Sequence, residues 1–180
     1  MRLRDRGADA PATYDTVTRV NHWLGAALVL AMLTIGLVFT DLPPGAARSF
    51  WRTLHIAIGT VYVPLVAFRL IWRWRVAAPP ALAAGGQLAR AVHGLLLVAL
   101  VAMLASGVLM QWFGGRPIGV FDLLRIASPV PASEVWHERM EQAHGVLAWC
   151  LMGLIGVHLA AVLMHSVRHG RAFWSRMVGE

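Results

Sequence analysis

Long apolar runs without any charged side chain divide the chain into four segments. These charge-free windows are 20–40, 53–68, 91–115 and 142–167. A helix that crosses a bilayer needs about 20 mainly apolar residues, with a usual range of about 17–25. Three windows are long enough by themselves, and Arg52 and Arg69 can extend the short second one by reaching towards the headgroups. The pattern therefore predicts four membrane-spanning helices, at about 18–40, 50–74, 88–113 and 138–168.

Turn-forming residues separate these segments. The connections contain "DLPPG", then "AAPPALAAGG", and finally a longer stretch from 114 to about 134. Within the long connection, "GVFDLLRI" is apolar enough to form either a short interfacial helix or a packed loop. We expect residues 1–180 to form a single all-α domain, an integral membrane four-helix bundle with antiparallel neighbours.

The composition agrees with a membrane protein. Of the 180 residues, 58% are apolar and 14% are charged, whereas a soluble domain has about 45–50% and about 25%. The net charge of +7 does not indicate nucleic-acid binding, because the basic residues, all arginine, gather at the ends of the predicted helices. The chain therefore meets lipid rather than nucleic acid.

The arginines also predict the orientation of the chain. Eleven lie on the side of both termini: Arg2, Arg4, Arg6, Arg19, Arg69, Arg73, Arg75, Arg90, Arg168, Arg171 and Arg176. Five lie on the other side: Arg48, Arg52, Arg116, Arg125 and Arg139. Since arginine is enriched in cytoplasmic connections, we expect a multi-pass protein of the bacterial inner membrane with both termini in the cytoplasm.

Histidines lie inside the apolar windows, where an imidazole costs free energy unless something binds it. His144 and His158 are fourteen residues apart on the fourth predicted helix. This spacing is about four turns and about 21 Å of rise, with an angular error of only about 40°, so both rings leave one face. Two other histidines lie at matching depths, His55 at the periplasmic level and His22 at the cytoplasmic level.

Two histidine pairs stacked in this way predict two haems, each held by two axial imidazoles. We call His22 and His158 the inner pair, and His55 and His144 the outer pair. A single intramembrane histidine is often only a hydrogen-bonded packing group, but paired depths favour ligation. Zinc fits less well, because the two levels are far apart and neither a carboxylate nor a thiolate is at hand.

Four further positions leave alternatives open. His165 lies two turns beyond His158 on nearly the same face and could replace it as the inner ligand, although its depth argues against this. His93 has no predicted partner, so it is either an interfacial histidine or a contact to a haem propionate or a quinone. Gly25 and Gly59 lie one turn from His22 and His55, and they either make room for a flat macrocycle or let the helices pack closely.

Three segments resemble the bacterial cytochrome b561 family. The first is "VNHWLGAALVLAMLTIGLVF" and the second is "LHIAIGTVYVPLVAFRLIWRW" followed by "PP". The third is the histidine-bearing stretch of the fourth predicted helix, which ends in "LMHSVRHGRAFWSRM". The resemblance extends roughly from Tyr14 to Met177. It implies a four-helix inner-membrane cytochrome with two non-covalent b-type haems that exchanges electrons with ubiquinone.

The resemblance also implies roles for particular residues. His22 and His158 correspond to the ligands of the inner haem, and His55 and His144 to those of the outer haem. Arg69, in an R-x-x-x-R segment with Arg73, would lie near the propionates of the inner haem.

Two functions remain as alternatives. One is a stand-alone oxidoreductase that oxidises superoxide at the periplasmic side and reduces ubiquinone. The other is an electron-relay cytochrome b subunit of a complex like a hydrogenase or formate dehydrogenase, with a redox protein as its partner. A structural bundle without haem would leave the paired histidines unexplained. The compact length and short N-terminal tail favour the first function.

Overall fold

Four long helices form the molecule in a computed structural model that describes residues 13–76, 86–121 and 123–179. The helices are α1 (Thr16–Asp41), α2 (Ala46–Arg75), α3 (Gly86–Phe113) and α4 (Glu134–His169). All four are long and apolar enough to cross a membrane. The expectation of an all-α membrane four-helix bundle is confirmed. Arg2, Arg4, Arg6 and most of the Pro-rich connection after α2, residues 77–85, lie outside the described residues.

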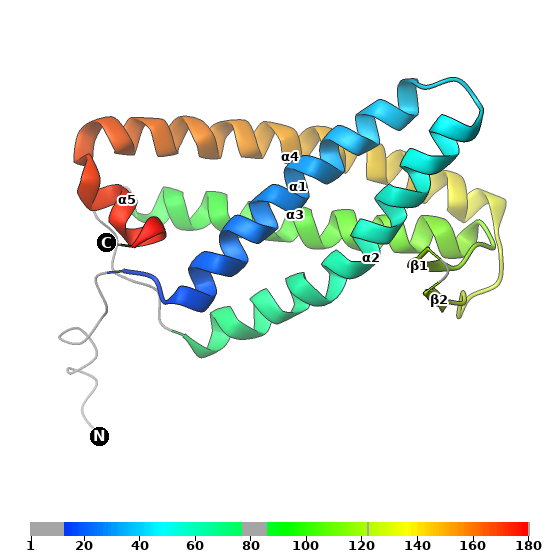
Figure 1. The fold of residues 1–180 in the computed structure, drawn as a ribbon, viewed down its shortest axis with the longest axis horizontal. Helices are drawn as coiled ribbons and strands as arrows, with labels where there is room; N and C mark the ends of the chain where they lie inside the picture. The colour runs from blue at the N-terminus through cyan, green and yellow to red at the C-terminus, as the bar shows by residue number, and fades with distance from the viewer. Residues whose placement is uncertain (1–12, 77–85, 122, 180) are drawn as a thin grey trace.

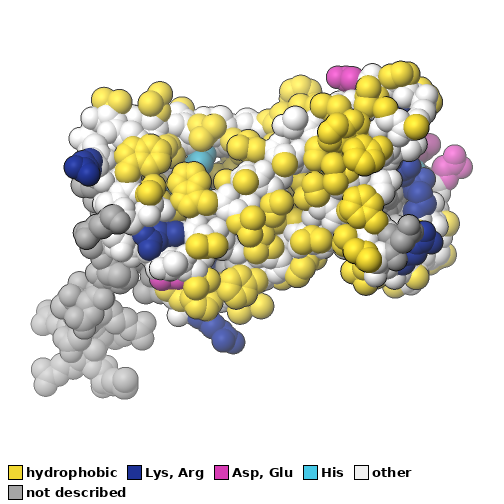
Figure 2. Space-filling model, viewed as in Figure 1, with side chains coloured by type: hydrophobic (Ala, Val, Ile, Leu, Met, Phe, Trp, Pro, Cys, Tyr) yellow, Lys and Arg dark blue, Asp and Glu magenta, His cyan; other side chains and the backbone are white. Residues whose placement is uncertain are grey.

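The bundle is built from two helical hairpins. α1 packs along α2, and α3 packs along α4, whereas the two hairpins contact each other only sparsely. In Figure 1 the first hairpin runs obliquely across the second. At most 17% of the 18-residue apolar window in any candidate span is buried inside the protein, and hydrophobic side chains are spread over much of the face shown in Figure 2. The helices therefore present apolar surface chiefly to lipid.

The helix ends are defined by capping residues. Ser133 caps α4, because its side chain accepts a hydrogen bond from the Trp136 backbone N–H, and α4 consequently begins four residues before the predicted start at 138. Gly170, with φ of 53°, ends α4 in a conformation that favours glycine. A short helix, α5 (Arg171–Val178), follows it.

The long connection between α3 and α4 contains a β-hairpin. Strand β1 (Ile118–Val120) pairs antiparallel with β2 (Leu124–Ile126), with Gly119 opposite Arg125. A Cβ on Gly119 would collide with the backbone carbonyl of Leu124, so glycine is required there. Of the two alternatives left open for this stretch, the short interfacial helix is excluded, because the backbone hydrogen bonds are satisfied between two strands instead.

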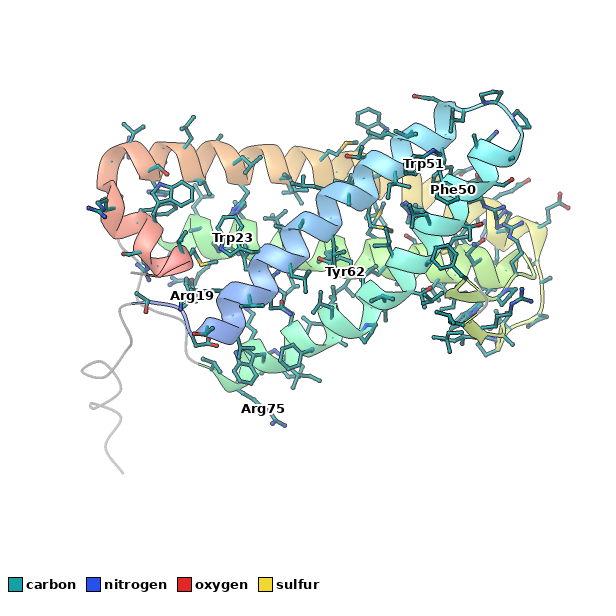
Figure 3. All side chains as sticks on the ribbon, viewed as in Figure 1. Arg19, Trp23, Phe50, Trp51, Tyr62 and Arg75 are labelled. Carbon is teal, nitrogen blue, oxygen red and sulfur yellow. The ribbon has the colours of Figure 1, made fainter. Side chains whose placement is uncertain are left out.

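The start of α1 and the α5 helix meet at the opposite end of the bundle. The indole N–H of Trp23 donates to the Met177 carbonyl over 3.0 Å, and the Tyr14 backbone N–H donates to the Arg176 carbonyl over 3.2 Å. α5 therefore docks on the start of α1. Deeper in the first hairpin, the hydroxyl of buried Tyr62 (Figure 3) donates to the Gly25 carbonyl over 3.1 Å, which ties α2 to α1.

Asp15 connects the start of α1 with the end of α2. Its carboxylate accepts from the Thr18 backbone N–H over 3.0 Å, from the Thr18 hydroxyl, and from the Trp72 indole N–H over 3.1 Å. Burial raises the pKa of this carboxyl, but the hydrogen bonds from Thr18 and Trp72 together outweigh it and leave the pKa below its usual value. The ionised carboxylate therefore stabilises this end of the bundle.

We expect Asp15→Ala to destabilise the detergent-solubilised protein by about 0.5–2 kcal/mol, the usual cost of losing an N-cap. Asp15→Asn should lose less, since asparagine also caps helices well. The folded-state pKa is depressed, so the stabilisation is present above the unfolded pKa of about 3.9 and is lost as the pH falls through the folded value. Thermal unfolding followed by circular dichroism from pH 7 to pH 3 measures both effects.

Asp41, at the far end of α1, provides the matched control. Asp41→Ala should leave the melting temperature almost unchanged at every pH. Equal destabilisation by the alanine variants at the two positions would contradict a capping role for Asp15.

Candidate functional site

The outer pair comes together between α2 and α4. The ring centroids of His55 and His144 are 6.3 Å apart, with the ring planes at 79°. Nδ1 of His55 is buried and makes no well-formed hydrogen bond within the described residues, although the Met32 backbone lies close enough to interact with the ring. A buried ring nitrogen without a hydrogen bond costs free energy in hydrocarbon, so we expect the His55 ring to have a further binding partner.

The inner pair comes together between α1 and α4. The ring centroids of His22 and His158 are 6.4 Å apart, with the ring planes at 68°. The two pairs thus lie at two levels of the same helix, α4, as the fourteen-residue spacing predicts.

Both separations suit a metal between the rings. A metal–imidazole bond is about 2.0–2.1 Å long, so two rings on opposite sides of one iron have facing nitrogens about 4 Å apart and centroids about 6 Å apart. The observed separations, 6.3 and 6.4 Å, agree with this distance. The chemistry of the donors also fits haem iron, which takes neutral imidazole as an axial ligand.

His93 lies beside the inner pair, where sequence reasoning found no partner for it. Its ring centroid is 5.3 Å from that of His158, shorter than the separation of two rings on opposite sides of an iron. His93 is also exposed at the surface of the described chain. The inner level therefore holds three imidazoles, with His158 next to both of the others.

Arg69 brings a positive charge to this inner group. It lies close enough to His22, His93 and His158 for its charge to act on all three rings. Its guanidinium also lies at Gly25, where an added Cβ would be 3.3 Å from Nη1 and 3.2 Å from the Tyr62 hydroxyl. An arginine at this depth is suited to bind a carboxylate, which haem propionates would provide.

His165 belongs to a different group of side chains. Its ring stacks on His169 and on Phe173 of α5, with centroids 5.8 Å apart in each case. The structure thus places His165 at the junction of α4 and α5, and it brings His158 rather than His165 next to His22.

Sequence reasoning missed the residues of α3 that contact His144. The Ser106 hydroxyl lies 3.0 Å from Nδ1 of His144, and a Cβ on Gly107 would lie 3.0 Å from Cε1 of the same ring. Gly36 plays a similar part for His55, with 3.4 Å from an added Cβ to Cε1. The sequence did contain a signal for these contacts: Ser106, Gly107 and Gly36 are small residues on neighbouring helices at about the same depth as the histidines that they contact.

The glycines selected from the sequence have other neighbours. Gly25 adjoins Tyr62 and Arg69, and the space beside Gly59 is taken by the methyl group of Met32 at 3.2 Å. For these two positions, the contacts found in the structure are those of close packing between α1 and α2.

A cavity of about 400 Å³ opens at the β-hairpin end, between α2, α3 and β1. Arg52, Arg116 and Arg125 line it together with Gln111, and none of the described lining residues is acidic. Buried Gln111 holds two of the arginines: its Oε1 accepts from Arg52 Nη2 over 3.3 Å and from Arg116 Nε over 3.1 Å. A neutral amide thus holds two cations at the wall of one cavity.

Within the described part of the chain, no group of three or more His, Cys, Asp or Glu side chains is arranged to hold a metal ion. The two histidine pairs, with two donors each, suit a metal whose remaining ligands belong to a cofactor.

Comparison with known proteins identifies the family. A family model described as prokaryotic cytochrome b561 matches residues 13–180. "Cytochrome b561 homolog 2" of Escherichia coli (strain K12) is 26% identical over 180 residues, which cover 96% of this chain and 94% of that protein. The chain belongs to the prokaryotic cytochrome b561 family, whose members are membrane electron-transfer cytochromes that bind b-type haem.

Proposed function

We propose that the protein carries two b-type haems and moves electrons across the membrane between them. His22 and His158 would hold the inner haem, and His55 and His144 the outer one. The observation that carries this proposal is the presence of two imidazole pairs from different helices, each with the ring separation that one iron requires. When bound, the haems supply one-electron chemistry, and the protein positions and tunes them.

The vertical spacing of the pairs supports a path across the bilayer. His144 and His158 are fourteen residues apart on α4, which corresponds to about 21 Å of rise. The hydrocarbon core is about 30 Å thick. Two electron carriers at these levels would divide the path of an electron across the hydrocarbon into shorter transfers than one carrier would allow.

Ubiquinone is the proposed acceptor at the inner level. We orient both termini towards the cytoplasm, since eleven of the sixteen arginines lie on that side. His93, Arg69 and Arg90 then lie at the cytoplasmic end, where their nitrogens would donate hydrogen bonds to the carbonyl oxygens of a quinone.

Superoxide is the proposed donor at the outer level. The five arginines of that side are matched in number by Asp41, Asp122, Glu134, Glu138 and Glu141, so net charge provides no attraction. The cavity does attract an anion locally, because Arg52, Arg116 and Arg125 line it. Glu141 interacts with Arg52, but it does not belong to the cavity lining. Overall, two superoxide anions leave as dioxygen after losing one electron each, and ubiquinone takes up two electrons and two protons.

Haem content and ligand variants test the proposed ligands. The purified protein should yield close to two haems per chain after acid–acetone extraction, because the sequence has one cysteine and no C-x-x-C-H motif that would attach haem covalently. His55→Ala or His144→Ala should remove the outer haem alone, and His22→Ala or His158→Ala the inner haem alone, so each ratio falls to about one.

His165→Ala is the matched control, because His165 lies on α4 and stacks on His169 and Phe173. This variant should keep both haems. Loss of the inner haem in His165→Ala with its retention in His158→Ala would reverse the ligand assignment, and a wild-type protein without haem would end the proposal.

Stopped-flow mixing tests the donor. Superoxide should reduce the haems of the oxidised protein rapidly, and the double variant Arg52→Ala/Arg116→Ala should slow the bimolecular rate by about 10-fold, since local charge raises the encounter rate of an anion. Arg48→Ala/Arg139→Ala removes equal charge from the same side without touching the cavity lining, so it should slow the rate much less. Haem content near two confirms that each variant is folded.

Two results would contradict this part of the proposal. If superoxide leaves the wild-type haems oxidised, the relay-subunit function, with a redox protein as the donor, replaces it. If both double variants slow the reaction equally, the cavity has no special part in it.

A further inference from the structure

The hydrogen bonds around His144 fix which of its nitrogens carries the proton. The Ser106 hydroxyl donates its single hydrogen to the Met103 carbonyl over 2.9 Å. Only lone pairs of that oxygen are then left for Nδ1 of His144, 3.0 Å away, and the Met103 backbone also lies close enough to interact with the same ring. Nδ1 must therefore be the protonated nitrogen that donates, because two acceptors facing each other would repel.

The second nitrogen of the ring follows from this assignment. A neutral imidazole carries one N–H, so with the proton on Nδ1 the other nitrogen, Nε2, offers a lone pair. That lone pair is what a haem iron binds, and metal-binding histidines commonly donate their other N–H to an oxygen nearby. Ser106 is 5% exposed, so water does not compete well for this hydrogen bond.

The residue after Ser106 constrains the same ring from beside it. A Cβ on Gly107 would lie 3.0 Å from Cε1 of His144, closer than side chains usually approach. α3 therefore supplies both a hydrogen bond that orients the ring and the space that the ring needs. Within the described residues, the other three histidines of the two pairs have no such side-chain hydroxyl bonded to the ring.

We infer that Ser106 is the positioning residue of the outer haem, acting through His144 by holding its Nε2 towards the iron and by increasing its electron donation. This inference rests on the proposed ligand role of His144. A hydrogen bond from Nδ1–H makes the imidazole a stronger donor, and a stronger donor favours ferric over ferrous iron. The hydroxyl should therefore lower the reduction potential of the outer haem.

Redox titration and electron paramagnetic resonance of the haem-loaded protein test the inference. In Ser106→Ala, the midpoint potential of the outer haem should rise and its ferric low-spin signal should move, while the inner haem stays unchanged. Ser106→Thr keeps a hydroxyl and should restore both values. The matched control is Ser166→Ala. The Ser166 hydroxyl also donates to a backbone carbonyl of its own helix, that of Val162 over 2.7 Å, but within the described part of the chain no hydrogen bond joins this hydroxyl to a histidine ring.

Each outcome decides the matter. A shifted outer potential in Ser106→Ala that Ser106→Thr restores supports the inference, as does loss of the outer haem in the alanine variant alone. An unchanged potential and signal in Ser106→Ala would overturn it, and so would equal disturbance in the alanine and threonine variants, since packing rather than the hydroxyl would then be responsible. If the wild-type protein lacks an outer haem, or His144→Ala retains it, the proposed ligand pair fails instead.

Discussion

An imidazole inside a lipid bilayer must find a partner, and this requirement organises the molecule. Hydrocarbon offers no water to a ring nitrogen, so each histidine in a span costs free energy until a hydrogen bond or a metal satisfies it. The pairs His22–His158 and His55–His144 each join one helix of the first hairpin to α4 of the second. Because the hairpins otherwise contact each other sparsely, iron bound between the rings would also hold the two hairpins together.

Charged and polar side chains are placed at the two ends of this arrangement. At the inner level, Arg69 acts on three histidine rings and adjoins Tyr62, whose hydroxyl ties α2 to α1. At the outer level, buried Gln111 holds Arg52 and Arg116 at the wall of a cavity beside the β-hairpin. Cationic side chains thus lie beside the inner histidine pair and at the β-hairpin end of the bundle.

Much of the fold and the pairing of histidines could be predicted from the sequence, because both depend on periodicity along single helices. Charge-free windows define the spans, and a separation of fourteen residues returns a helix to nearly the same face. The rest depends on how segments far apart in the chain meet. The approach of His93 to His158 follows from the packing and rotation of α3 against α4, and the contact of Ser106 with His144 follows from the same packing.

The β-hairpin and the role of Gln111 were beyond sequence reasoning for a related reason. An apolar stretch of eight residues fits a short helix and a pair of short strands equally well by hydrophobicity. Close approach of Gly119 to the Leu124 backbone decides between them, and it is visible only in three dimensions. In the sequence, Gln111 is a single polar residue near the end of a predicted helix. Its role in holding Arg52 and Arg116 is seen only from the hydrogen bonds that both arginines donate to its side-chain oxygen.

The most direct test of the central claim is the visible spectrum of the purified protein reduced with dithionite, recorded before and after addition of carbon monoxide. Two bis-imidazole haems leave no axial position open on either iron. We therefore expect the sharp bands of low-spin b-type haem, and we expect carbon monoxide to leave them unchanged. A spectrum without haem bands, or one that carbon monoxide shifts, would contradict the assignment of a histidine pair to each iron.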